Sequence, residues 1–325
     1  MIVLAVDGGN SKTDLALVRS DGEVLALARG PASSPQHLGA ERCLDILESL
    51  LDEAAAERPE IELAELLLAG VDFPAEVDQL ERLAAARGWA RRIVVDNDTF
   101  AILRAGTERG WGVAVTCGAG INCVGVTPDG RHARFPSLGQ LSGDWGGGYD
   151  VGMAAVSAAA RSEDGRGPTT TLELAVPEHF GLEAPSALAE AIHFGRISER
   201  RVVELAPVVL AEAADDPVAA ELRDRLAGEI VSLVRVALLR LDLTAEPVEV
   251  VLGGGLLQSG DAGLLGAVEH ELREVAPSVS LQVVEAPPIV GVALLALEEV
   301  GARPQALARA RAELGTPTLA RTSGG

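Results

Sequence analysis

The chain has 325 residues, 48% of them hydrophobic and 3% aromatic, and a net charge of −21. A chain of this length is too long for a single simple hydrophobic core, so two domains are predicted. The acidic charge argues against binding to nucleic acid or to an anionic membrane surface through bulk charge. No uncharged apolar run of about 18 residues occurs, so no membrane span is expected. Three cysteines without metal-site spacing, together with the lack of a signal peptide, predict a cytoplasmic protein.

The first predicted element is a β-hairpin with a glycine-rich tip. An apolar strand at residues 2–6 ends in Asp7, and a second strand follows at 14–18. The turn between them consists of Gly8, Gly9, Asn10, Ser11, Lys12 and Thr13. Glycines let the backbone approach a ligand closely, and successive N–H groups in such a turn form an anion-binding nest. Asp7 would repel a bare phosphate, so a cation is expected between them.

Short strands then alternate with helices. Strands are predicted at 23–29, 66–70 and 93–95, and helices at 38–58, 74–87 and 99–104. This alternation indicates an α/β layer with a partly parallel sheet. Asp72 and Asp98 follow strands, at the carboxyl ends where ligands bind in open α/β sheets. Asp98 could instead cap the helix after it, and Asp96 competes for its position at the same strand end.

The opening pattern recurs in the second part of the chain. A strand at 111–115 leads into a turn that contains Thr116, Cys117, Gly118, Ala119 and Gly120, and a return strand follows. Residues 139–152 are rich in glycine and are predicted to form a specialised loop. Helices are predicted from 153 to about 242, and a strand at 248–252 ends in Gly253, Gly254 and Gly255. We interpret the chain as two related halves, with an all-helical insertion in the second.

The sequence does not match the motifs of two common nucleotide-binding folds. The P-loop pattern is absent at residues 8–13, and this segment continues into a strand instead of a helix. No dinucleotide-binding glycine pattern opens a helix after the first strand.

The motifs resemble those of the sugar kinase, actin and heat-shock ATPase superfamily. The chain is more closely similar to the N-acetylglucosamine kinase-like branch of the BadF/BadG/BcrA/BcrD ATPase family. Residues 7–13 resemble its first phosphate loop, 116–122 its second, and 251–255 its adenosine motif; further cues are residues 95–98, 143–144 and 288–291. The resemblance implies an α/β fold with two ribonuclease H-like (actin-like ATPase) domains, each with a mixed sheet, and ATP in the cleft between them.

The implied domain boundaries follow from the same resemblance. The N-terminal domain comprises residues 1–110 and about 288–315, because the last helix returns to it. The C-terminal domain comprises residues 111–287, with the helical insertion at 153–242.

The resemblance also implies the activity and the residues that carry it. The expected reaction is transfer of the γ-phosphoryl group of ATP to a hydroxyl of an amino sugar such as N-acetylglucosamine or glucosamine. Asp98 would be the catalytic base and Asp7 would hold Mg²⁺. The phosphates and the nucleotide would bind to Gly8, Gly9, Asn10, Ser11, Lys12, Thr13, Thr116, Gly118, Ala119, Gly120, Gly253, Gly254 and Gly255. The sugar would bind to Ser34, Asp72, Asn122, Gly143 and Asp144.

The chain departs from the branch in the sugar loops. The Asn, Trp and Glu that the resembling kinases carry there are replaced in this sequence. The sequence therefore leaves open which sugar is phosphorylated and on which hydroxyl. Trp145 could stack on a sugar or anchor its loop. A homodimer through the helices of the second domain is possible, although core packing explains those helices equally well.

The family resemblance leaves two other functions open. An ATPase activator of a CoA-ester dehydratase or reductase would need well-placed cysteines for an iron–sulfur cluster. Cys43, Cys117 and Cys123 do not have such a placement. A non-catalytic sugar or nucleotide sensor is disfavoured by the retained Asp98 and by the lack of a helix-turn-helix extension.

Overall fold

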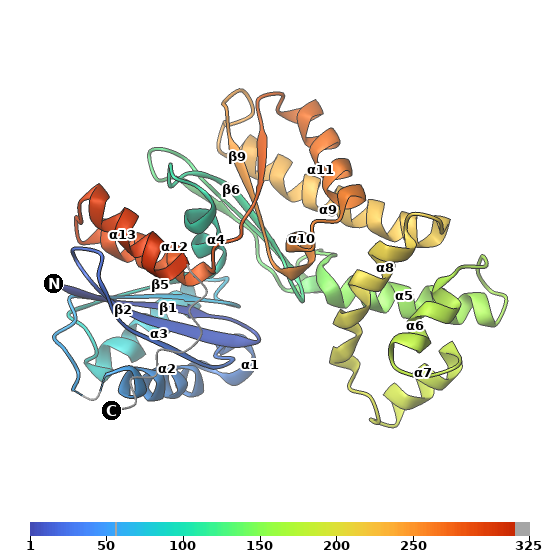
Figure 1. Ribbon diagram of the computed structural model, residues 1–325, viewed down its shortest axis with the longest axis horizontal. Coiled ribbons are helices and arrows are strands. Elements are labelled where there is room, and N and C mark those ends of the chain that lie inside the picture. Colours follow the sequence, from blue (N-terminus) through green and yellow to red (C-terminus); the bar gives the residue numbers. More distant parts are fainter. Residues whose placement is uncertain (56, 316–325) are drawn as a thin grey trace. The chain divides into compact units, whose positions relative to one another are not determined.

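The computed structural model describes residues 1–55 and 57–315. Tertiary contacts divide the chain into two compact units. Unit 1 comprises Met1–Gly112 together with Val284 and the described residues after it, and unit 2 comprises Val113–Val283. Each unit contains one five-stranded sheet (Figure 1).

The sheet of unit 1 has β1 (Ile2–Gly8) at its centre. This strand pairs antiparallel with β2 (Lys12–Arg19) and parallel with β4 (Leu63–Leu68). On the outer sides, β3 (Val24–Pro31) pairs antiparallel with β2, and β5 (Arg92–Asn97) pairs parallel with β4. The carboxyl ends of β1, β4 and β5 therefore meet at one edge of the sheet.

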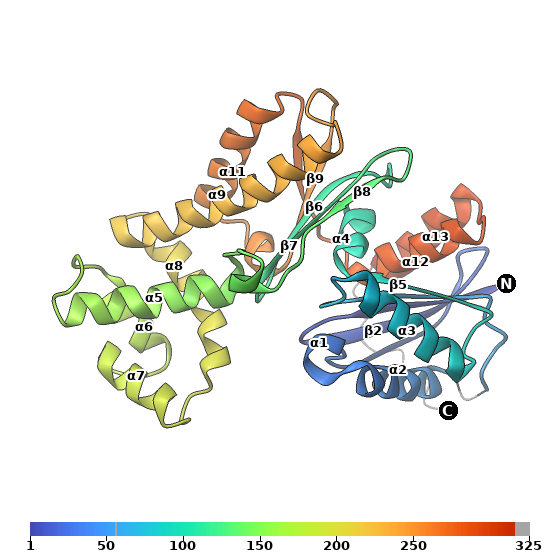
Figure 2. The same cartoon turned by 180° about the vertical axis from the view of Figure 1, so that it is seen from behind.

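Helices cover both faces of this sheet (Figure 1). One face packs against α2 (Ala40–Ala54) and α3 (Pro74–Arg87), which lie side by side in the view from behind (Figure 2). The short α1 (Pro35–Leu38) precedes α2. The other face packs against α4 (Thr99–Gly106) and α12 (Pro288–Glu299), and α13 (Pro304–Gly315) packs on α12.

The alternation of side chains along β1 explains why both faces are covered. Leu4 and Val6 belong to the apolar cluster formed with α2, whereas Val3 and Ala5 belong to the cluster formed with α12. Successive side chains of a strand point to opposite faces, so an apolar run such as this one requires a partner on each side. The last part of the chain thus completes the core of unit 1.

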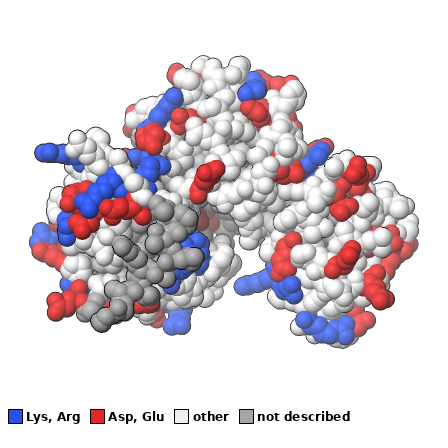
Figure 3. Space-filling model, in the orientation of Figure 1, with Lys and Arg blue, Asp and Glu red and all other residues white. Residues whose placement is uncertain are grey.

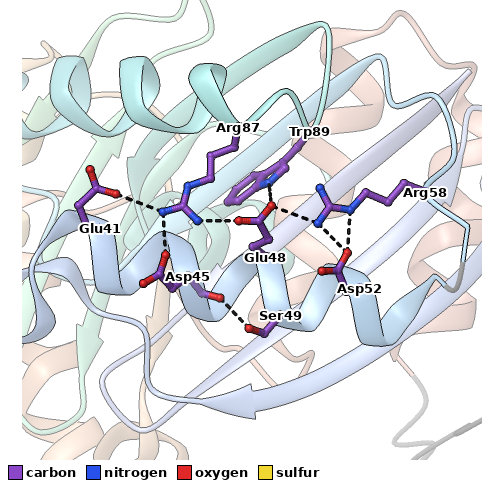
Figure 4. Close-up of polar contacts among 8 residues, drawn as sticks. All are labelled: Glu41, Asp45, Glu48, Ser49, Asp52, Arg58, Arg87 and Trp89. Carbon is purple, nitrogen blue, oxygen red and sulfur yellow. Dashed lines mark hydrogen bonds and ion pairs between the residues drawn. The ribbon is translucent and has the colours of Figure 1, made fainter.

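A network of charged side chains ties α3 to α2 (Figure 4). Arg87, at the end of α3, donates to Glu48 at 2.6 Å and to Asp45 at 2.8 Å on α2. The Arg87 guanidinium holds the pKa of Glu48 below its usual value. Because α3 ends where the chain turns towards the start of β5, the network lies at the edge opposite the strand carboxyl ends. The network therefore joins two helices and lies away from the strand carboxyl ends.

The sheet of unit 2 repeats the order of unit 1. Its central strand, β6 (Gly112–Cys117), lies beside β7 (Ile121–Val126) and parallel to β9 (Glu249–Gly253). The outer strands are β8 (His132–Arg134), antiparallel to β7, and β10 (Ser280–Val283), parallel to β9. Two mixed five-stranded sheets with the same order confirm the predicted fold class.

Most helices of unit 2 lie between β8 and β9 in the sequence. They are α5 (Gly147–Glu163), α6 (Leu172–His179), α7 (Pro185–His193), α8 (Ala206–Glu212) and α9 (Pro217–Arg240), with short 3-10 turns η1 (Gly139–Leu141) and η2 (Glu199–Leu205). After β9 come α10 (Gly255–Gln258) and α11 (Ala262–Val275), and α11 packs beside α9 (Figures 1 and 2).

Helix α5 begins inside the stretch that was predicted to be a loop. Its glycines serve close packing: a Cβ at Gly152 would lie 1.9 Å from the carbonyl oxygen of Val202 in η2. Tertiary packing thus overrides the low helix propensity of glycine.

Acidic side chains are spread over the face shown in Figure 3, with basic ones among them. Within the described residues, no helix combines the length and the apolar character that a membrane crossing requires.

Candidate active site

The first glycine turn joins β1 to β2 at the centre of the unit 1 sheet. The amide of Gly9 donates to the carbonyl of Lys12 at 2.9 Å, while Asn10 and Ser11 at the tip are exposed. The buried Thr13 hydroxyl lies 2.7 Å from the Pro31 carbonyl and 2.7 Å from the Ser33 hydroxyl. Thr13 therefore holds the turn against the end of β3.

Two carboxyl groups near this turn have raised pKa values. Burial, then the charges of Asp98 and Asp14, raise the pKa of Asp7 to about 8. Burial, then the charge of Asp72, raise the pKa of Asp98 to about 7. A carboxyl group with a pKa near the working pH is suited to accept a proton.

Asp98 does not cap the helix that follows it. Asp98 precedes α4, but its side chain makes no capping hydrogen bond. The side-chain oxygen of Asn97 instead accepts from the amide of Thr99 at 2.9 Å and from its hydroxyl at 2.6 Å.

Asn97 also connects two strand ends. Its side-chain amide donates to the Asp72 carboxylate at 3.1 Å and to the Val71 carbonyl at 3.3 Å. Asn97 is buried and thus fixes Asp72 beside Asp98. Sequence reasoning missed this residue, although its place between two aspartates at a strand end was a usable signal.

Ser34 lies in the same unit, next to the end of β4. Its side chain is buried, and its hydroxyl donates to the carbonyl of Ala69 at 2.9 Å. The structure therefore places Ser34 against the segment that follows β4, and Asp72 at the end of that segment lies near Asp98.

The second glycine turn joins β6 to β7 in unit 2. The amide of Gly118 donates to the carbonyl of Gly120 at 2.9 Å, which closes the turn. The carbonyls of Gly118 and Ala119 accept from the amides of Gly148 and Tyr149 at the start of α5, at 2.7 and 2.9 Å. A Cβ added at Gly118 or Gly120 would meet nothing within 4 Å, so the outer side of this turn is open to a ligand.

Thr116 provides a polar group that lacks a partner. Its hydroxyl oxygen is buried and makes no hydrogen bond within the described residues. A buried polar group left unpaired costs about 1–3 kcal/mol, which a ligand oxygen would offset.

The triple glycine lies beside the second turn. Gly253 pairs with Thr116 in the sheet. Gly254 has φ +87°, and a Cβ there would lie 2.4 Å from the Cys117 carbonyl oxygen, so only glycine is accommodated. Gly255 begins α10.

The loop before α5 carries Gly143 and Asp144. Asp144 accepts from the Ser142 hydroxyl at 2.5 Å, and its amide donates to the Gly139 carbonyl at 3.0 Å. The Arg225 guanidinium of α9 lies 3.8 Å from the centre of the Trp145 ring. One face of the indole is thus occupied, which supports the loop-anchor interpretation of Trp145. Asn122, on β7, accepts from the amide of Cys123 at 2.7 Å.

The side chains near the first turn suit a single Mg²⁺ ion better than an iron–sulfur cluster. In the part of the chain that the structure describes, no three His, Cys, Asp or Glu side chains are grouped to hold an ion. Mg²⁺ commonly uses only one or two carboxylates, with water and phosphate oxygens as its other ligands. Asp7 is buried between like charges, so a cation would stabilise its ionised form. Cys43, Cys117 and Cys123 are each buried and free, which gives no support to an iron–sulfur site.

Two mixed sheets of the same order, each opened by two strands that flank a glycine turn, define a two-domain protein with the actin-like α/β fold. The sequence profile of the BadF/BadG/BcrA/BcrD ATPase family matches residues 4–296, and the chain belongs to this family.

Similar proteins include named kinases. The chain is 28% identical over 263 residues to the N-acetylmuramic acid/N-acetylglucosamine kinase of Clostridium acetobutylicum, covering 79% of this chain and 86% of that protein. It is 24% identical to the N-acetyl-D-glucosamine kinase of Dictyostelium discoideum, covering 91% and 98% of the two chains.

The solved structures that resemble this chain also include sugar kinases. A putative N-acetylglucosamine kinase from Chromobacterium violaceum has a TM-score of 0.72 at 27% identity, covering 90% of this chain and 98% of that one. A ROK family glucokinase from Streptomyces griseus shares the fold, with a TM-score of 0.56 at 17% identity, covering 92% and 99% of the chains.

Proposed function

We propose that the protein is an ATP-dependent kinase that transfers the γ-phosphoryl group of ATP to a hydroxyl of an amino sugar such as N-acetylglucosamine or glucosamine. Membership of an ATPase family supports the use of ATP. Similarity over most of the chain to kinases of N-acetylmuramic acid and N-acetylglucosamine supports the acceptor class. The observation that carries the proposal is Asp98, a carboxyl group with a pKa of about 7 at the carboxyl end of β5.

Each residue then has a role in phosphoryl transfer, which depends mainly on positioning and on charge stabilisation. Asp98 accepts the proton of the attacking hydroxyl, and Asn97 keeps Asp72 beside it. Unit 1 supplies the first turn for phosphate oxygens. Unit 2 supplies the second turn, including the Thr116 hydroxyl, and the triple glycine for the nucleotide.

Asp7 is the proposed Mg²⁺ ligand. A bound Mg²⁺ would neutralise part of the phosphate charge. Ser34, Asp72, Asn122, Gly143 and Asp144 are the proposed sugar contacts. The protein is proposed to be cytoplasmic. It is also proposed to form a homodimer, and light scattering tests this assembly.

The test is ADP release measured against a panel of amino sugars, with and without Mg²⁺. The Asp98→Asn variant is expected to lose about 10²–10⁴-fold in kcat, the usual contribution of a general base. ADP binding, measured by calorimetry, is expected to persist. Asp96→Asn, at the same strand end, is the matched control and is expected to retain turnover.

Normal turnover by Asp98→Asn would contradict the role of this residue. ATP hydrolysis that does not depend on any sugar would contradict the kinase assignment and would favour an ATPase that drives another protein.

A further inference from the structure

A row of charged side chains crosses three strands of unit 1 beside the first glycine turn. In the register of the sheet, Asp7 on β1 lies opposite Asp14 on β2, and Asp14 lies opposite Arg29 on β3. Residues directly opposite one another project from the same face of a sheet. Lys12 precedes Asp14 by two positions on β2 and therefore also faces this side. Asp7 and Lys12 are thus linked by a residue that has no role in the proposed chemistry.

Asp14 is the centre of this row. Its carboxylate accepts from Arg29 Nε at 2.6 Å and from an Arg29 terminal nitrogen at 2.9 Å, in a bidentate arrangement. The second carboxylate oxygen also lies 3.2 Å from Lys12 Nζ. The Asp14 side chain is 3% exposed, whereas those of Lys12 and Arg29 are 46% and 57% exposed.

Stability alone does not explain this arrangement. A buried ion pair is often no more stabilising than apolar residues of similar volume. The carboxylate also adds negative charge next to Asp7, whose pKa it helps to raise. In a site for a polyanion, this second acid is unfavourable unless the cations that it holds are needed there.

Those cations differ in what they can do. Lys12 lies at the rim of the turn on a long flexible side chain, which loses up to about 2 kcal/mol of conformational free energy when it is fixed. A contact that fixes it before the ligand arrives removes this loss from binding. Because Arg29 also pairs with Asp14, the negative charge of Asp14 is shared between Arg29 and Lys12. Lys12 is therefore held without its positive charge being fully neutralised.

We propose that Asp14 and Arg29 are positioning residues for nucleotide binding at the first turn. Asp14 holds the ammonium group of Lys12 at the turn, and Arg29 holds Asp14 and shares its charge. The ligand class is a nucleoside di- or triphosphate, as the proposed function requires. The inference concerns nucleotide binding and does not depend on which acceptor is phosphorylated.

The test measures ATP and ADP affinity without sugar, by calorimetry, together with KM for both substrates. Asp14→Asn and Arg29→Ala are each expected to weaken nucleotide affinity about tenfold, the scale of a lost charged hydrogen bond. KM for the sugar is expected to stay within about twofold. Arg29→Lys, which keeps the charge but not the bidentate geometry, is expected to restore part of the affinity.

Arg19→Ala is the matched control, because the exposed Arg19 lies at the far end of β2 and pairs with Glu23. It is expected to bind nucleotide like the parent protein. A Lys12→Ala background separates positioning from general damage: Asp14→Asn is expected to have little further effect when Lys12 is absent.

Opposite results would overturn the inference. If Asp14 acted only as a repelling charge, Asp14→Asn would bind ATP more tightly. Equal losses from Asp14→Asn with and without Lys12 would show that Asp14 does not act through Lys12. Failure to phosphorylate any sugar, with nucleotide affinity changed as expected, would contradict the kinase assignment and leave this inference standing.

Discussion

The first glycine turn, in unit 1, is held by side-chain as well as backbone hydrogen bonds, whereas the bonds described for the second, in unit 2, join backbone groups. Thr13 contacts Ser33 and Pro31 beside the first turn, and Asp14 pairs with Arg29 close by. The second turn relies on the amides of Gly148 and Tyr149, which donate to Gly118 and Ala119. Two segments that look alike in sequence therefore depend on different contacts: a buried hydroxyl supports the first turn, and the close approach of the start of α5 supports the second.

The difference predicts the largest effect at Gly147, beside the second turn. Gly147 has φ +75°, and a Cβ there would lie 2.5 Å from the backbone of Gly120. Gly147→Ala is expected to destabilise unit 2 by roughly 3 kcal/mol and to abolish nucleotide binding, because strain and a clash combine. Urea unfolding and ADP calorimetry are the measurements.

Gly165→Ala is the control, since Gly165 has φ +77° but open space around its Cβ position. It is expected to lose only about 1 kcal/mol, the cost of the left-handed backbone. Equal losses for the two variants would mean that the contact with Gly120 does not matter.

The charged surroundings of the first turn predict a pH dependence. kcat/KM for the sugar is expected to fall about tenfold per pH unit below about 7, because protonated Asp98 cannot accept a proton. The second turn contains no carboxyl group, and burial raises the pKa of Cys117 to about 12. A flat profile between pH 5.5 and 8 would argue against Asp98 as the base.

The stability of the metal-free protein should move the other way. Asp7 and Asp98 have higher pKa values when folded than when unfolded, so the folded chain binds their protons more tightly. The stability that this binding provides is present below about pH 4 and is lost as the pH rises through 7 to 8. A thermal scan at each pH measures it, and Asp98→Asn is expected to show a smaller change.

A smaller effect is expected at Thr13. Thr13→Val keeps the shape but removes the hydroxyl, which leaves two groups without their partner and costs about 1–3 kcal/mol. Nucleotide affinity is expected to fall severalfold with it. Thr127→Val, in the β7–β8 hairpin, also removes a buried hydroxyl with two partners. This control should lose similar stability while its nucleotide affinity stays unchanged; a matching loss of affinity would refute a specific role for Thr13.

The smallest effect is expected at Arg225. Removing its contact with Trp145 costs about 0.5–1 kcal/mol, so Arg225→Ala should raise the sugar KM by up to about fivefold. Arg240→Ala on the same helix, which loses a contact with Phe135, should leave KM unchanged. Trp145 fluorescence should change only in the first variant. An unaltered sugar KM in Arg225→Ala would separate Trp145 from sugar binding.

The fold and the two turns could be predicted because they depend on local signals, namely apolar strands, glycines and acids at strand ends. The role of Arg29 could not, because it arises from strand register, which brings Arg29 opposite Asp14. Asn97 stands out between two aspartates at a strand end, but its contact with Asp72 arises only in the folded chain. The start of α5 was missed because glycine composition indicates a loop. The close approach of η2 at Gly152, which favours glycine there, is not visible in a single sequence.

The return of the C-terminal helices to unit 1 has a consequence for biosynthesis. Unit 2 is one continuous stretch of chain, whereas unit 1 needs both its first residues and α12. During translation, Val3 and Ala5 emerge long before their partners on α12, because all of unit 2 lies between them in the sequence. Until α12 is made, this face of the N-terminal sheet is covered only in part, by α4, and its exposed apolar surface favours aggregation or chaperone binding.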